Sequence, residues 1–117
     1  MASPADPILI YATFPDAESA RVIAGRIVDQ RLAACANILG AMTAVYRWEG
    51  AVTGGDEVAV IFKTTVARAE AAIAEISRHH PYDVPAIVSL EPSGGHAPFL
   101  HWLATETRAT DRPDSQE

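Results

Sequence analysis

The spacing of the apolar residues alternates along the chain between helix-like and strand-like segments. The order of these segments limits the folds that the chain can adopt more than any other sequence feature does. Segments 17–32 and 66–79 repeat apolar residues every three to four positions, which is typical of amphipathic helices. Between them, residues 33–63 are rich in β-branched and aromatic residues, which indicates a long hairpin. Apolar runs at 8–14 and 86–90 have strand length. The chain is therefore predicted to be α+β, a ferredoxin-like β-α-β-β-α-β sandwich with a four-stranded antiparallel sheet and two helices on one face.

Capping and breaking residues predict where the helices begin and end. Asp16 is a good N-cap for the first helix, and Thr65 can cap the second. Pro81 disfavours helical geometry at the residue before it, so the second helix should end at 79. A short C-terminal helix is predicted over 99–107, with Pro98 at its first position.

The remaining segments predict one turn region and one buried strand. Segment 49–57 holds three glycines and is predicted to form the turn of the hairpin. The run 8–14 does not alternate with polar residues, which indicates a strand buried on both faces. One domain over 1–117 is expected, with an ordered core at about 8–107 and polar tails at 1–6 and 108–117.

Composition excludes several classes of protein. The chain has nine basic and fifteen acidic residues, so its composition lacks the excess of basic residues typical of nucleic-acid-binding proteins and of polybasic membrane patches. A single cysteine allows no internal disulfide. No signal peptide precedes the first apolar run, and no segment reaches the roughly 20 apolar residues of a membrane span. We therefore expect a cytoplasmic protein.

Large apolar residues exceed what one face of the sheet can hide. Tyr46, Trp48, Ile61 and Phe62 lie on the hairpin, whose long edge would stay open in a monomer. Oligomerisation with closed symmetry is therefore expected.

Several motifs resemble those of the CutA family of divalent-cation tolerance proteins, in order from about residue 8 to 107. They are RLAACANI at 31–38, VYRWEG at 45–50, Glu57 with FKTT at 62–65, HHPYDVP at 79–85 and FLHWL at 99–103. The resemblance implies a ferredoxin-like subunit in a tight homotrimer whose hairpins pair across subunits.

The resemblance also implies a function and a ligand set. The family is linked to tolerance of divalent metals, copper especially, and no catalysis is implied. The paired histidines that bind copper in some members correspond to His79 and His80. The first-strand cysteine of those members is replaced here by Ala12, which removes the thiolate that favours Cu(I).

Each candidate site residue also has a structural interpretation. His79 and His80 are adjacent, so they cannot easily hold one ion together. One could cap the helix while the other faces a subunit seam, and the alternative is weak copper or other divalent-cation ligation. Cys35 is either a small buried apolar residue or a soft ligand or redox sensor. Pro81 and Pro85 make a rigid turn that could present Tyr82 to a cleft.

A second group of residues suggests a ligand cleft between subunits. Its members are Trp48, Glu57, Lys63, Tyr82 and Trp102. Glu57 and Lys63 lie roughly 20 Å apart on one strand and cannot pair with each other. Lys63, the single lysine, either extends its amine into water or helps to bind an anion or small ligand.

The sequence leaves competing functions open. One is a PII-like trimer that senses small ligands at subunit clefts, although no long effector loop is evident. Another is an acylphosphatase-like enzyme using Arg21 and Asn37, but FPDAE at 14–18 would repel a phosphate. The favoured interpretation is a metal-binding homotrimer without catalysis.

Overall fold

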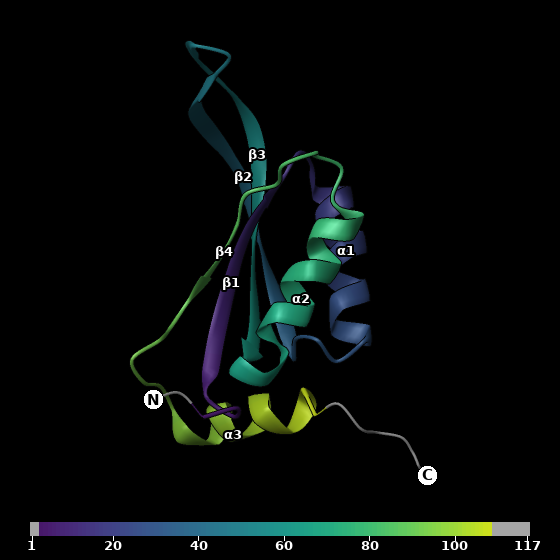
Figure 1. Ribbon diagram of the computed structural model, residues 1–117, viewed down its shortest axis with the longest axis vertical. Coiled ribbons are helices and arrows are strands. Elements are labelled where there is room, and N and C mark those ends of the chain that lie inside the picture. The colour runs from purple at the N-terminus through teal and green to yellow at the C-terminus, as the bar shows by residue number, and fades with distance from the viewer. Residues whose placement is uncertain (1–2, 109–117) are drawn as a thin grey trace.

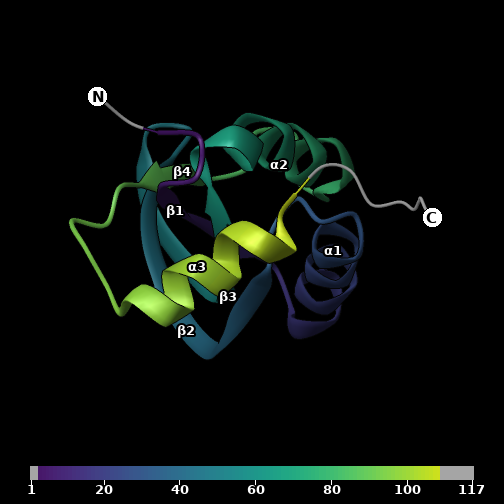
Figure 2. The same cartoon turned by 90° about the horizontal axis from the view of Figure 1, so that it is seen from below.

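The computed structural model describes residues 3–108, which form one antiparallel sheet with two helices on one face (Figure 1). The elements are β1 (Pro7–Phe14), α1 (Ala17–Asp29), β2 (Cys35–Trp48), β3 (Ala51–Thr65), α2 (Val66–His79), β4 (Ile87–Leu90) and α3 (Ala97–Glu106). The strand order is β2-β3-β1-β4. Helix α3 crosses beneath one end of the sheet (Figure 2). The predicted α+β class and its order of elements are confirmed.

Strand β1 lies at the centre of the sheet but is fully covered on one face only. It pairs with β3 from Pro7↔Thr65 to Phe14↔Val58, and with β4 on its other side. Its residues Ile8, Ile10, Ala12 and Phe14 belong to the core under α1 and α2. Alternate residues such as Leu9 and Tyr11 are half-buried. The prediction of a strand buried on both faces is therefore wrong for the single chain, because the helices cover one face.

Helix α1 begins where its capping residue predicts. The Ser19 N–H donates to Oδ1 of Asp16 at 2.8 Å, and this hydrogen bond lowers the pKa of Asp16. The buried side of the helix carries Ala20, Ile23, Ala24 and Ile27, the apolar stripe read from the sequence.

Thr65 occupies the N-cap position of helix α2 as predicted, but its side chain makes no capping hydrogen bond, and main-chain carbonyls accept from the first amides instead. The N–H groups of Val66 and Ala67 donate to the carbonyl oxygens of Asp6 and Pro4, at 2.9 and 3.0 Å. The Thr65 hydroxyl instead lies 3.4 Å from the hydroxyl of Thr107. Residues 3–6, predicted as a polar tail, thus contribute to the fold; residues 1–2 and 109–117 lie outside the described part of the chain.

Strands β2 and β3 form a hairpin that projects beyond the rest of the molecule (Figure 1). Only Glu49 and Gly50 form the turn, and their φ angles are 49° and 83°. Positive φ at both residues gives a two-residue loop the twist that matches the right-handed twist of the strands. The predicted turn over 49–57 is wrong, since Gly54 and Gly55 lie within β3. We call residues 41–58, beyond the register shift between Leu39 and Ala41, the arm.

Candidate functional site

His79 and His80 stand at the end of α2 but have different surroundings. His80 is 8% exposed and stacks on Phe14, with ring centroids 4.6 Å apart. Its Nε2 lies 2.7 Å from the carbonyl oxygen of Thr13, and the Tyr82 N–H donates to its Nδ1 at 3.0 Å. Because Nδ1 accepts, Nε2 carries the proton and donates to Thr13. Both ring nitrogens of His80 are therefore bound to backbone.

His79 is the more accessible imidazole of the pair. Its side chain is 29% exposed, and its Nε2 lies 3.1 Å from Oε2 of Glu75, one helical turn earlier. Glu75 also accepts hydrogen bonds from Arg78 and Gln30. These two bonds, Arg78 first, lower the pKa of Glu75 to about 2, so the carboxylate beside His79 stays ionised.

An open cavity of about 370 Å³ adjoins His79, between the start of α1 and the end of α2. It is lined by Asp16, Glu18, Ser19, Val22, Ile23, His79 and Pro81. Among residues 3–108, no three His, Cys, Asp or Glu side chains are grouped closely enough to hold one metal ion. A cation at His79 would therefore take few ligands from one chain, and Glu75 is the nearest carboxylate. The sequence reading missed Glu75, although its i, i+4 spacing to His79 was the available signal.

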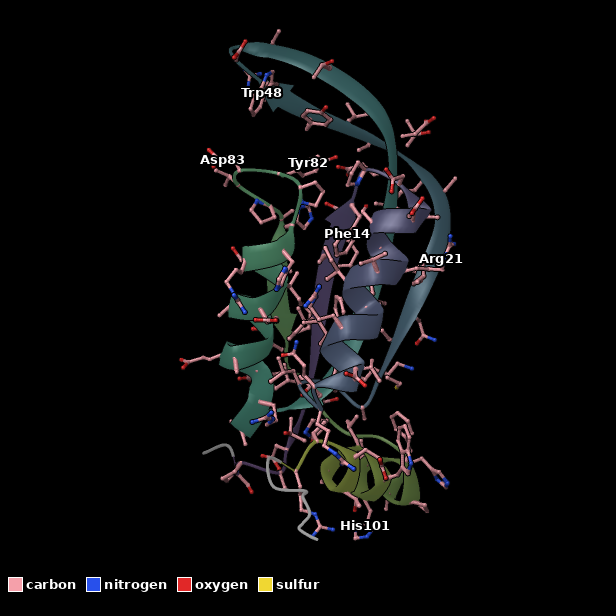
Figure 3. All side chains as sticks on the ribbon, turned by 90° about the vertical axis from the view of Figure 1, so that its right-hand side faces the viewer. Phe14, Arg21, Trp48, Tyr82, Asp83 and His101 are labelled. Carbon is pink, nitrogen blue, oxygen red and sulfur yellow. The ribbon has the colours of Figure 1, made fainter. Side chains whose placement is uncertain are left out.

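Tyr82 connects the loop after α2 to β3. Its hydroxyl donates to Oε2 of Glu57 at 3.3 Å. Burial raises the pKa of Tyr82, and the negative charge of Glu57 raises it further. The contacts with His80 and Glu57 thus hold Tyr82 against β3, and Figure 3 shows Tyr82 above Phe14 and below the arm.

Lys63 lies at the other end of β3, away from Tyr82. Its Nζ is 5.5 Å from the centroid of the Phe99 ring, which stacks on Trp102 at 5.9 Å. Lys63 is paired across the strands with Cys35. Burial raises the pKa of the Cys35 thiol, and the charge of Lys63 opposes this change. Cys35 is partly buried, which is compatible both with a small apolar packing residue and with a soft ligand or redox sensor.

The five residues predicted for a ligand cleft fall into separate places. Glu57 contacts Tyr82, Lys63 lies over Phe99 of α3, which also carries Trp102, and Trp48 lies at the tip of the arm (Figure 3). One chain does not bring them together. Ala12 is fully buried in β1, so even a side chain with ligand atoms there would face the core.

Comparison with known proteins decides the family. The family model described as CutA1 divalent ion tolerance protein matches residues 8–106. The chain belongs to this family.

Relatives of the CutA1 family agree in sequence and in fold. The chloroplastic CutA 1 of Oryza sativa is 38% identical over 101 residues, 86% of this chain, which spans 57% of the rice protein. The CutA of Thermus thermophilus, named a divalent-cation tolerance protein, is 38% identical over 99 residues, covering 85% and 96% of the two chains. The CutA crystal structure from Xylella fastidiosa has a TM-score of 0.86 at 35% identity, covering 88% and 99%. The relatives named here carry no catalytic name, and in residues 3–108 no helix is long and apolar enough to cross a membrane.

Proposed function

We propose that this CutA1 family member is a homotrimer that binds divalent cations such as copper, with His79 as the imidazole ligand of each subunit. The observation that carries the proposal is the pair of His79 and Glu75, 3.1 Å apart beside an open cavity. Imidazole and carboxylate suit divalent copper and zinc. The family name supports the link to divalent cations.

The donor set favours a weak site for a divalent ion. One chain contributes few ligands, so water would complete the coordination of the metal. The alanine at position 12 supplies no thiolate, and a site without thiolate loses the preference for Cu(I). His80 has a separate role in this proposal, which is to hold the loop that follows α2.

Copper titration by calorimetry tests the metal site. The His79→Ala variant should lose binding, whereas His101→Ala, a matched change on α3 at the far end of the molecule, should retain it (Figure 3). Unchanged copper affinity in His79→Ala would refute the assignment. Soaking crystals with copper and recording anomalous scattering would then show where ions bind.

The arm supports the proposed trimer. Four of its large apolar residues are exposed, namely Val45, Tyr46, Trp48 and Val52, at 74%, 46%, 64% and 66%. The radius of gyration is 15.4 Å, against about 13.4 Å expected for a compact domain of this length. Such an extended apolar hairpin fits a subunit whose partners cover it.

The proposal includes a binding rather than a catalytic role, in the cytoplasm. The candidate residues hold no nucleophile with a neighbouring general base among the described contacts, and a broad acyl phosphate assay should give no turnover. Fractionation of cells that express the full chain tests the compartment, since the rice relative is named chloroplastic.

A second candidate function, small-ligand sensing between subunits, is favoured by Lys63. Within residues 3–108 its amine has no carboxylate partner and lies over Phe99. In a trimer, the arm of one subunit could bring Trp48 toward residues of another. Calorimetry with nucleotides tests this candidate, and Lys63→Gln should abolish any binding found there.

A further inference from the structure

A second cavity, of about 330 Å³, lies at the opposite end of α2 from His79. It forms where the first turn of α2 lies next to α3 and the N-terminal segment (Figure 1). The lining residues are Pro4, Ala5, Thr65, Ala67, Arg68, Ala104, Thr107 and Arg108. Neither His79 nor Glu75, the residues of the proposed metal site, lines this cavity.

The charge of this cavity opposes that of the whole chain. The chain has fifteen acidic and nine basic residues, yet the lining contains two arginines and no acid. Two carboxylates adjoin lining residues in sequence: Glu106 pairs with Arg31 at 3.9 Å, and Asp6 accepts the N–H of Ser3 and keeps its negative charge. The positive end of the α2 dipole lies here as well, which adds to the attraction for anions.

The two guanidinium groups have donors to offer a ligand. Arg68 donates through Nε to the carbonyl oxygen of Arg31 at 3.3 Å, which leaves its two terminal nitrogens. The side chain of Arg108 makes no hydrogen bond or ion pair with the rest of the described chain. Planar guanidinium groups bind the oxygens of phosphate in pairs, with charge-assisted hydrogen bonds.

The other polar groups of the cavity are already bound within the protein. The first two amides of α2 donate to Asp6 and Pro4. Thr65 and Thr107, 3% and 2% exposed, contact each other through their hydroxyls, and Thr107 donates to the carbonyl of Leu103. Because these amides and hydroxyls already have partners within the protein, the arginines are the groups that would bind an anion.

We propose that this cavity binds a phosphate monoester of a small metabolite, with the phosphate between Arg68 and Arg108. The alanines and Pro4 offer an apolar wall for the rest of the ligand. The volume falls at the lower end of the range of about 300–1,000 Å³ that is common for small-molecule pockets, and it exceeds the needs of an inorganic ion. The site is independent of His79, so either proposal can fail without the other.

Calorimetry on the full chain at constant ionic strength tests the proposal, with glycerol 3-phosphate, inorganic phosphate and glycerol as probes. Glycerol 3-phosphate should bind, inorganic phosphate should bind more weakly, and glycerol should not bind. Arg108→Gln should weaken glycerol 3-phosphate binding about tenfold or more, because a charge-assisted hydrogen bond is lost. The matched control is Arg21→Gln, an exposed arginine on α1 well away from α3 (Figure 3), which should bind like the wild type.

Arg108→Gln is the decisive variant, since its side chain has no described contact to lose. Arg68→Gln should weaken binding by a similar factor, and urea unfolding would show whether the loss of its bond to Arg31 also affects the fold. Three results would overturn the proposal: no heat with either phosphate probe, wild-type affinity in Arg108→Gln, or equal weakening in Arg21→Gln. Equal affinity for both phosphate probes would retain the oxyanion site and assign it to free phosphate.

Discussion

Two neighbouring imidazoles differ because one faces the core and the other faces solvent. His80 bridges the end of β1 to the loop after α2, through Thr13 on one side and Tyr82 on the other. His79 is partly exposed, and among the described residues its ring makes a hydrogen bond to Glu75 alone. A cation can therefore reach one of them without breaking a backbone contact.

Replacing His80 by alanine should destabilise the protein by about 2–4 kcal/mol. The change leaves the Thr13 carbonyl and the Tyr82 N–H without partners and removes the ring that stacks on Phe14. The control His79→Ala should cost about 1 kcal/mol or less, as it removes one partly exposed side-chain hydrogen bond to Glu75. Urea unfolding at neutral pH compares the two, and equal losses would contradict this account.

Glu75 should make stability depend on pH in the acid range. Its pKa is lowered from 4.5 to about 2 in the folded state, so its contribution is fully present above pH 4.5 and is lost as pH falls toward 2. The difference in unfolding free energy between the wild type and Glu75→Gln should therefore shrink across that window. Urea unfolding of both proteins at several pH values measures it; a difference that stays constant would mean that Glu75 is not held ionised by Arg78 and Gln30.

Among the elements, the arm depends on one glycine for close approach of its strands. A Cβ at Gly54 would lie 2.6 Å from the carbonyl oxygen of Ala44, whereas a Cβ at Gly55 would meet nothing within 4 Å. Gly54→Ala must push the two strands apart, and we expect a loss of about 1–3 kcal/mol. Gly55→Ala is the matched control and should be close to neutral. Hydrogen exchange of the arm amides measures the effect, and equal protection in both variants would show that the strands separate without cost.

The same glycine explains why the elements were only partly predictable. Helices α1 and α2 could be predicted, because each carries apolar residues with a period of 3.6 residues, and Pro81 marks the end of α2. Gly54 and Gly55 resemble a turn in sequence, but their role depends on the strand across from them. The surroundings of His80 were equally hidden, because Thr13 is 67 residues away and only the pairing of β1 brings its carbonyl to the imidazole.

For the whole molecule, the exposed arm predicts how a trimer would be disrupted. Val52→Lys places a charge on the arm where the proposed partners would cover it, so it should release single subunits. Val22→Lys is the control, because Val22 is 58% exposed on α1, on the helical face of the sheet. Sedimentation velocity at micromolar concentration distinguishes the two. A wild type that sediments as a lone, folded subunit would overturn the trimer itself.

The backbone cap on α2 extends the network of fold contacts toward the N-terminus. The family match begins at residue 8, and a chain trimmed to that boundary would lose only Pro7 from the strands and helices. It would nevertheless lose the carbonyls of Pro4 and Asp6, leaving two amides at the head of a helix with no acceptor from the protein. We therefore expect a chain that keeps residues 4–7 to unfold at a higher urea concentration than one trimmed to the family boundary.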